Sequence, residues 1–261
     1  MDGRRFDADH ETLRRFWIEA DQIKGDRAWL TGDEVHHARK VLRLGRGDHL
    51  RLLDGLGFEY LARIAVTAPD HLELEILDKQ PASGESALNL VLGLAMLKSD
   101  HMDLVVRKGT ELGLTTLAPV YSARTTARLK DDRNERRLER WRKISLQAVK
   151  QCRRARPVEV RRPVDLEDFL ADSDRADLRI LLHERLPRTD ARTRPEWIDQ
   201  HPPPRSIRLL VGPEGGWTDG EAARAMASGF APWRLGPRIL RAETAAVALM
   251  AIVGYQWGDL K

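Results

Sequence analysis

Two glycine-proline corners in the last third of the chain combine residues that could bind a small ligand and do chemistry on it. In the first, "LLVGPEGGWTDGE" at 209–221, an apolar run stops at Gly-Pro and Glu214 follows. In the second, "LGPRILRAETAA" at 235–246, Arg241 and Glu243 follow the same dipeptide. Glycine lets a backbone approach a ligand closely, and the carboxyl ends of strands in open α/β sheets are common ligand sites. We therefore expect both corners to contact a ligand.

The residues of these corners narrow the class of ligand. Neither corner matches the glycine patterns G-x-x-x-x-G-K-[ST] or G-x-G-x-x-G, which hold phosphates. The carboxylate of Glu214 would repel a phosphate, so the corners suit a neutral or positively charged ligand that is held by backbone groups. A single glycine-proline corner is also typical of a purely structural turn, and it is the second corner that favours a binding site.

A strongly basic segment precedes the corners. Residues 124–162 hold 15 Lys or Arg against 5 Asp or Glu, a net charge of +10, whereas the whole chain carries +4. Such a concentration of positive charge indicates a polyanionic partner, although a solvated helix face is an alternative. The stretch "WRKISLQAVKQCRRARP" predicts an anchored helix with charge on its outer face, because its apolar residues recur at helical intervals, namely Trp141, Ile144, Ala148 and Cys152.

Composition excludes several classes of protein. The 261 residues, 42% of them hydrophobic, are enough for two domains or one large one. Cys152 is the single cysteine, which excludes an internal disulfide and a Cys-rich zinc site, and His36-His37 has no suitably spaced partner for a metal. The apolar run 245–255 is too short to cross a bilayer, and the N-terminus shows no secretory signal. We expect a cytoplasmic protein with no metal and no membrane association.

The sequence pattern of residues 13–80 is typical of a small β-barrel with one helix. Strands are expected in "LRRFWIE" and "HLELEIL", and two β-rich runs around the turn "DGLG" predict a hairpin. The helix is expected at 31–45, where Thr31 and Glu34 form a capping box. Its inward-facing residues are expected to be Val35, Ala38, Val41 and Leu42. Residues 81–87 are expected to form a linker.

From residue 88 onward, strands alternate with helices, which is typical of an α/β sheet. The run "LNLVLGLAML" is apolar throughout, as in a strand that is buried on both faces. Thr218 and Glu221 form a second capping box at the start of a helix. The final helix, 243–257, can pack closely against another helix because it carries small residues, namely Ala245, Ala246, Ala248, Ala251 and Gly254.

The two corners as a pair, followed by an apolar terminal helix, resemble the SPOUT methyltransferases. More closely, the chain resembles the RsmE family, which methylates N3 of a uridine in 16S ribosomal RNA. The resemblance covers nearly everything after residue 13, while the first twelve residues have no counterpart. The matching pieces are "RRFWI", "HHARKVLRLGRGDHLRLLDG", "KSDHMDLVVRKGTELG", "SARTTARL", "RWRKISLQAVKQCRRARP", "LLHE", "LVGPEGGWTDGE" and "LGPRILRAETAA".

This resemblance implies an α/β protein with an N-terminal PUA-like β-barrel and a C-terminal SPOUT domain threaded into a trefoil knot. The implied order is an extension at 1–12, the RNA-binding barrel at 13–80, the linker at 81–87 and the methyltransferase domain at 88–261. It also implies a homodimer and S-adenosylmethionine as the cofactor. The implied cofactor pocket consists of Leu182, His183, Val211, Gly212, Gly215, Leu235, Gly236, Ile239 and Leu240.

Methylation of uridine N3 requires the enzyme to activate the acceptor, because N3 carries a proton at neutral pH. The enzyme must remove that proton or stabilise the uridinate, whose charge spreads onto two oxygens. An arginine fork suits such an oxyanion, and the first candidate is Arg241, followed by Arg124 and Arg153. Glu214 or Glu243 could accept the proton or orient an arginine. The alternatives are capping of loop amides for Glu214 and charge stabilisation of a helix N-terminus for Glu243.

The implied partner is 16S ribosomal RNA in the decoding region, or the assembled small ribosomal subunit. Candidate RNA contacts are Arg15, Arg39, Arg43, Arg153 and Arg154, and His37 could join those of the barrel. Two other classes of function stay open, a noncatalytic RNA-binding assembly factor on a SPOUT scaffold and a different small-molecule α/β enzyme. The paired corners argue against the first, and the missing phosphate motif argues against the second.

Overall fold

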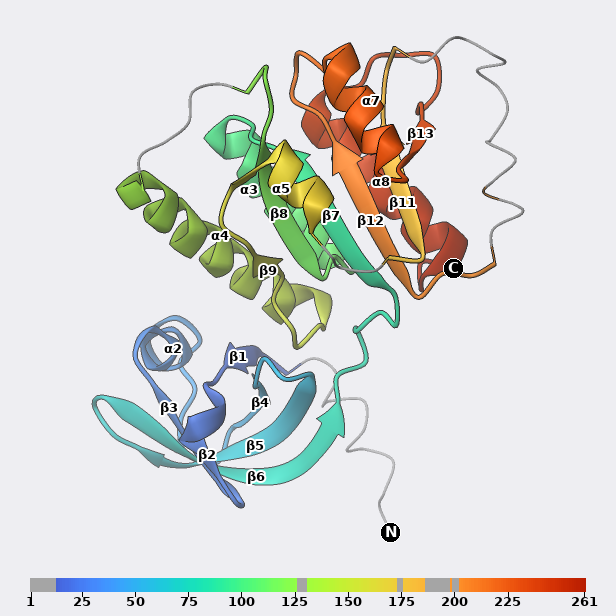
Figure 1. The fold of residues 1–261 in the computed structure, drawn as a ribbon. Helices are drawn as coiled ribbons and strands as arrows, with labels where there is room; N and C mark the ends of the chain where they lie inside the picture. The colour runs from blue at the N-terminus through green and yellow to red at the C-terminus, as the bar shows by residue number, and fades with distance from the viewer. Residues whose placement is uncertain (1–12, 126–130, 173–175, 186–197, 199–201) are drawn as a thin grey trace. The chain divides into compact units, whose positions relative to one another are not determined.

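In the computed structural model, the chain divides into two units near residue 85, where the sequence changes from mostly strands to alternating strands and helices (Figure 1). The first unit is Met1–Glu85 with Leu146–Pro157, and the second is Ser86–Ser145 with Val158–Lys261. The structure describes all residues except 1–12, 126–130, 173–175, 186–197 and 199–201. The expected N-terminal extension and the second half of "SARTTARL" therefore lie outside the described residues.

The first unit is built on a six-stranded sheet in the order β1-β4-β5-β6-β3-β2, an open half-barrel with β1 and β2 at its edges. The hairpin predicted around "DGLG" is formed by β4 and β5, which pair antiparallel. Alternating side chains of the sheet bury a core that includes Leu50, Leu52, Leu72 and Leu74. The strands are β1 (Arg15–Trp17), β2 (Ile23–Lys24), β3 (Arg27–Thr31), β4 (His49–Leu53), β5 (Phe58–Thr67) and β6 (His71–Pro81), with a 3-10 turn at Ala20–Gln22.

The helix of the first unit differs from the sequence prediction at its start. Thr31 ends β3, and α2 (Asp33–His36) begins after Gly32, which has no side chain and so cannot cap the helix. The Glu34 carboxylate accepts a hydrogen bond from the amide of Trp17 at 3.3 Å. The predicted capping box is therefore wrong, because Glu34 bonds to a strand that is distant in sequence and not to the helix start.

The same helix also departs from the predicted period. A π-helical turn, His37–Val41, follows α2 directly. Because a π turn bonds residue i to i+5, it rotates the later side chains away from the 3.6-residue pattern. Val41, predicted to face inward, is 60% exposed, whereas Val35 and Ala38 are buried as predicted.

The second unit is built on a parallel sheet in the order β10-β8-β7-β12-β11-β13, with β9 also paired to β8. Its central strand β7 is buried except at its first residue, as the apolar run predicted. Parallel strands place their carboxyl ends at one edge, where α/β proteins bind ligands. The strands are β7 (Asn89–Ala95), β8 (Thr116–Tyr121), β9 (Glu159–Val160), β10 (Val164–Asp165), β11 (Leu178–Leu182), β12 (Ser206–Val211) and β13 (Ala231–Trp233).

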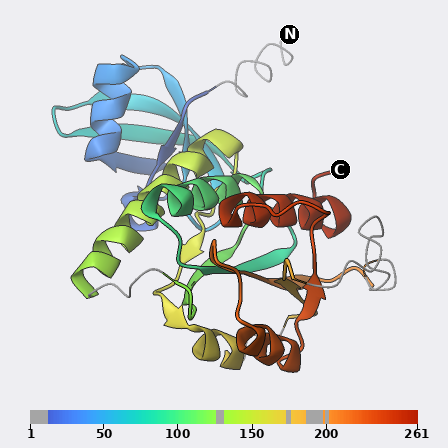
Figure 2. The same cartoon turned by 90° about the horizontal axis from the view of Figure 1, so that it is seen from above.

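Helices cover both faces of this sheet, as Figures 1 and 2 show. On one face lie α3 (Ser99–Glu111) and α8 (Ala242–Trp257), and on the other lie α5 (Leu166–Ala171) and α7 (Asp219–Ala227). Each face has its own apolar core, the first including Met102 and Leu249 and the second including Phe169 and Trp217. The described helices thus cover the two faces of the sheet, and the strand ends lie between these layers.

Helix α4 (Asp131–Cys152) belongs to both units. Leu138 and Trp141 lie in the core of the second unit, while Val149 packs in a small cluster of the first. The predicted linker is also tied to the first unit, because the Glu85 carboxylate accepts hydrogen bonds from two backbone amides beyond α4, those of Ala155 and Arg156, both at 2.7 Å. Among the described residues, no helix is long and apolar enough to span a membrane.

Candidate active site

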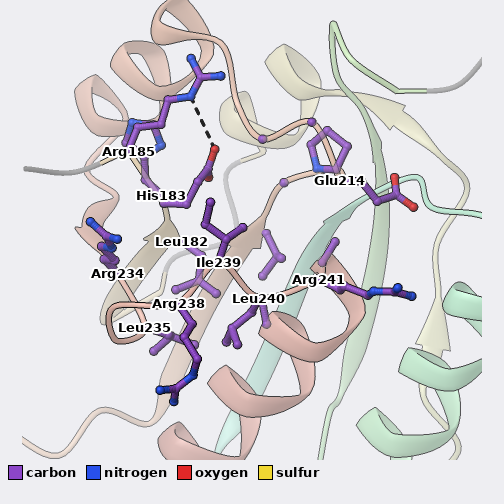
Figure 3. Close-up of a pocket in the computed structure, with 18 of the residues that line it drawn as sticks. Leu182, His183, Arg185, Glu214, Arg234, Leu235, Arg238, Ile239, Leu240 and Arg241 are labelled. Atoms are coloured by element: carbon purple, nitrogen blue, oxygen red, sulfur yellow. Dashed lines mark ion pairs between the residues drawn. The ribbon is translucent and has the colours of Figure 1, made fainter. Parts of the chain in front are cut away.

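A cavity of about 460 Å³ lies at the carboxyl ends of three neighbouring strands of the second unit, β11, β12 and β13. Its walls are the segments 182–185, 211–216, 233–235 and 238–242, with Ala245 of α8 (Figure 3). The two glycine-proline corners therefore meet at one cavity, as expected, although 22 residues separate the two Gly-Pro dipeptides in the sequence.

Eight of the nine residues expected to bind the cofactor line this cavity: Leu182, His183, Val211, Gly212, Gly215, Leu235, Ile239 and Leu240. The ninth, Gly236, does not. A Cβ atom at Gly236 would meet nothing within 4 Å, so close approach to a ligand is not what requires glycine there. Its φ of +67° is the reason, because this left-handed conformation is costly for residues with a side chain.

The cavity wall combines apolar surface with a buried polar atom that has no hydrogen-bond partner. The Nδ1 atom of His183 is buried and unpartnered among the described residues, while the His183 amide donates to the carbonyl of Trp233 at 2.9 Å. This backbone hydrogen bond fixes the end of β11 beside β13 and leaves the imidazole ring available to a ligand. At the rim, the side chain of Ile239 is 81% exposed. A ligand with a flat apolar body and polar edges fits these groups.

Two of the four expected catalytic residues, Arg241 and Glu214, line the cavity. Figure 3 shows both side chains extending to the same side, away from Leu235 and Arg238. Arg241 is the N-cap residue of α8, and its carbonyl accepts a hydrogen bond from the Ala245 amide at 2.8 Å. The helix therefore fixes the backbone of Arg241 while the guanidinium extends from the rim.

The third expected catalytic residue, Arg124, does not line the cavity. Its guanidinium Nη1 donates to the carbonyl of Gly215 at 2.6 Å and to that of Trp217 at 3.4 Å. These bonds hold the first corner from outside, so the structure places Arg124 as a clamp on the loop. The fourth, Glu243, is also outside the cavity lining and is only 6% exposed.

Sequence reasoning missed His101, which lies between the two glutamates. The Nδ1 atom of His101 is 3.5 Å from a carboxylate oxygen of Glu214 and 3.6 Å from one of Glu243. His101 is in the first turn of α3, directly after the loop that follows β7. The position of "SDHMD" just beyond a buried strand was the available signal, since that places the histidine at the same sheet edge as the corners.

Glu221 joins the first corner to the loop after β8. The predicted capping box with Thr218 is confirmed, and the Glu221 carboxylate also accepts a hydrogen bond from the Ala123 amide at 2.7 Å. Burial raises the pKa of the Glu221 carboxyl, but hydrogen bonds from the amides of Ala123 and Thr218 and from the Thr218 hydroxyl outweigh it, so the pKa lies below its ordinary value.

We expect Glu221→Gln to destabilise the protein by about 1.5–3 kcal/mol at pH 7, because hydrogen bonds to a buried carboxylate are lost. A lowered carboxyl pKa contributes stability that is present above the unfolded-state pKa and lost as the pH falls through the folded-state value. The difference in unfolding free energy between wild type and variant should therefore shrink under acid conditions. Urea unfolding at neutral and acid pH measures it, and a difference that does not change with pH would contradict this role.

Two of the arginines expected to bind RNA form ion pairs within the first unit, and their side chains are largely covered. Arg15 donates to Glu59 at 2.8 Å, and Arg154 pairs with Glu85 at 3.3 Å. Glu59 also pairs with Arg51 at 3.2 Å, and the side chains of both expected contacts are at most 11% exposed, which leaves little of them for RNA to reach. The sequence could not show this, because the partner glutamates lie 44 and 69 positions away.

The other three arginines have different surroundings. Arg39 donates to the carbonyl of Ala68 at 2.5 Å and is partly buried. Arg43 and Arg153 are exposed, and both have left-handed backbones, with φ of 57° and 67°. Both positions carry exposed positive charge, which is what a contact to a phosphate backbone requires.

Comparisons with known proteins agree with this architecture. A model described as an RNA methyltransferase domain matches residues 84–254, and one described as an RNA methyltransferase PUA domain matches residues 30–77. The ribosomal RNA small subunit methyltransferase E of a Synechocystis species is 33% identical over 237 residues, covering 91% of this chain and 76% of that protein. The Bacillus subtilis protein of the same name is 28% identical over 253 residues, covering 94% and 97%.

Solved structures give the same result. The ribosomal RNA small subunit methyltransferase E of Neisseria gonorrhoeae, bound to S-adenosyl methionine, is 31% identical with a TM-score of 0.83, covering 95% of this chain and all of that one. A Legionella pneumophila methyltransferase with bound cofactor is 28% identical with a TM-score of 0.84, covering 95% and 99%.

The half-barrel, the parallel sheet and the cavity at its carboxyl edge define an RNA methyltransferase with a PUA domain. Within that class, the chain belongs to the RsmE family, the ribosomal RNA small subunit methyltransferases E. The resemblance stated from the sequence motifs is thereby confirmed.

Proposed function

We propose that this protein transfers the methyl group of S-adenosylmethionine to N3 of a specific uridine in the decoding region of 16S ribosomal RNA. The observation that carries the proposal is the cavity between the two corners, where apolar walls and the unpartnered His183 Nδ1 meet the Arg241 and Glu214 side chains. Relatives that cover nearly the whole chain carry the matching name. With the ribosome as its substrate, the protein is expected to act in the cytoplasm.

The cavity residues suit this cofactor. Leu182, Leu235 and Leu240 offer apolar surface for an adenine ring, and His183 Nδ1 offers a polar partner for its edge. Gly212 lines the wall through its backbone. When bound, S-adenosylmethionine supplies a methyl group on a positively charged sulfur, and such a donor needs little further activation.

The protein must activate the acceptor. The Arg241 guanidinium, which is exposed at the rim, would stabilise the negative charge that develops on the uridine oxygens as N3 loses its proton. The Glu214 carboxylate extends to the same side and would accept that proton (Figure 3). Arg124 contributes indirectly, because it clamps the carbonyl of Gly215 beside Glu214.

The direct test is methyl transfer with the purified protein. Labelled S-adenosylmethionine is supplied with either naked 16S RNA or assembled small subunits, and the RNA is then digested to nucleosides. The expected product is N3-methyluridine at one position. Cofactor binding without transfer to either substrate would favour a noncatalytic RNA-binding role, and a methyl group on another atom would overturn the N3 assignment.

We extend the proposal to the family's topology and assembly. The C-terminal segment would be threaded into a trefoil knot around the cavity, which three strand-end loops enclose.

A homodimer would form through α8 and α3, which pack together and expose Ile252, Tyr255 and Leu104. Exposed apolar side chains on adjacent helices are typical of an interface. Sedimentation should then show a dimer of the 29.7 kDa chain at micromolar concentration.

RNA affinity should fall steeply with salt, because the +10 segment displaces phosphate counterions. Neutralising about 4–6 phosphates predicts a slope of log K against log salt of about −3 to −5. Arg136 and Arg142 are exposed on α4, and reversing both to glutamate should flatten the slope by roughly 2. Arg224→Glu on α7 is the matched control, and binding titrations at several salt concentrations give the slopes. If the double variant keeps the wild-type slope, the contact lies elsewhere, first at Arg43.

A further inference from the structure

His101, which lies outside the cavity lining, connects the two glutamates of the corners. Its Nδ1 atom lies 3.5 Å from Glu214 Oε1 and 3.6 Å from Glu243 Oε2. Among the described residues, both His101 Nδ1 and Glu243 Oε2 are buried and have no hydrogen-bond partner. Because both distances exceed those of good hydrogen bonds, charge is the main force available to hold the three groups together.

Because Glu243 is buried, a positive charge on His101 would stabilise its carboxylate. The Glu243 side chain is 8% exposed, and a buried carboxylate is costly unless a cation compensates it. Glu214, at 43% exposure, faces the same nitrogen, so the two carboxylates repel one another unless the imidazole is protonated. A third carboxylate, that of Asp100, is 3.7 Å from His101 Nε2, and Arg241 lies on the same side of the cavity as Glu214 (Figure 3).

The three groups come from three elements that frame the cavity. His101 is on α3, Glu243 is in the first turn of α8, and Glu214 is in the first corner. Helices α3 and α8 pack against one another, so the His101–Glu243 pair has a rigid base. Glu214 is the member that lies on a loop and lines the cavity, and it is therefore the member whose position the pair can set.

We infer that His101 is a positioning residue for methyl transfer: its imidazolium bridges the buried Glu243 to Glu214 and holds the Glu214 carboxylate at the cavity edge, where it accepts the N3 proton of uridine. This inference rests on the proposed function. In the step, the N3–H bond breaks as its proton passes to Glu214. The N3–CH₃ bond forms as the S–CH₃ bond breaks, and the electron pair of that bond stays on sulfur.

Charge-retaining and neutral variants separate positioning by charge from a merely structural contact. His101→Asn removes the charge, His101→Lys keeps it, and Lys108→Gln in the last turn of α3 is the control. Single-turnover methyl transfer to small subunits is measured from pH 6 to 9.5, with cofactor affinity measured by calorimetry. At pH 6, His101→Asn should be slower than wild type by roughly 10- to 100-fold with little change in cofactor affinity. His101→Lys should be near wild type.

The pH dependence supplies the readout that a structural role would not give. Histidine side chains in general lose their charge across this pH range, whereas lysine side chains keep theirs. The rate of His101→Lys relative to wild type should therefore rise with pH, and the rate of His101→Asn relative to wild type should approach one. Both ratios cancel the ionisation of uridine, because all variants share the same substrate.

Three results would overturn the inference. One is a wild-type rate for His101→Asn at every pH. Another is a folded His101→Lys variant that binds cofactor normally and is as slow as His101→Asn throughout. The last is a constant deficit of His101→Asn across the pH range. In all three cases wild-type activity keeps the proposed function intact, whereas a wild-type protein that methylates neither RNA nor subunits would overturn both.

Discussion

Arg241→Ala should bind cofactor and RNA almost normally and yet transfer the methyl group about 100- to 1,000-fold more slowly. Loss of a charged contact to a developing oxyanion typically costs about 3–4 kcal/mol, and that cost falls on the transition state. Raising the pH should partly restore the rate, because more of the uridine then ionises without help. Single-turnover transfer between pH 7 and 9.5, with separate binding measurements, tests this expectation.

Two further variants show whether the position and shape of the charge matter. Arg241→Lys should recover little activity, because an ammonium cannot present the planar fork of a guanidinium. Arg238→Ala removes the same charge from the opposite side of the cavity (Figure 3) and should cost less than about tenfold. Near-wild-type rates for Arg241→Ala at every pH would exclude it as the oxyanion partner. Loss of cofactor binding in that variant would instead make Arg241 a support of the second corner.

Gly212→Val should weaken cofactor binding by roughly 100-fold, which corresponds to about 3 kcal/mol. A Cβ atom at Gly212 would lie 3.0 Å from Nε1 and 3.1 Å from Cε2 of Trp217. Trp217 is fully buried in the core beside α7, so it cannot move aside without disturbing that core. The added side chain must therefore displace the cavity wall, and calorimetry with S-adenosylmethionine measures the result.

Gly220→Val is the matched control, because a Cβ atom there would meet only the flexible end of Arg224, at 3.3 Å. It should bind the cofactor as wild type does. Gly236→Val should have a smaller effect than Gly212→Val, since Gly236 does not line the cavity and the cost is backbone strain of about 1–2 kcal/mol. Normal cofactor affinity in a folded Gly212→Val variant would show that this wall does not form the cofactor site.

The candidate site could be located from the sequence but not completed from it. The two corners were expected from their glycine-proline pattern, and the family resemblance implied the eight residues that line the cavity wall. His101 was not, since nothing in its own segment shows that it faces Glu214, which is 113 positions later. Arg124 was expected near the reaction and instead clamps the first corner.

The sequence by itself determined the local structure of this protein. Periodicity and capping residues specify an element through neighbours a few positions away, so the hairpin of β4 and β5, the buried β7 and the Thr218–Glu221 cap were all predictable. Where the local signal was incomplete, as in the π-helical turn before Leu42, the prediction failed.

Only the tertiary structure decided which charged side chains meet. Arg15 and Arg154 are used in buried ion pairs, and His101 stands between two glutamates, because the sheet order and the crossovers bring distant segments together. A charged residue has the same local pattern whether it faces water, a nucleic acid or a buried partner. Its role is therefore decided by long-range packing, which sets both its burial and its counter-charge.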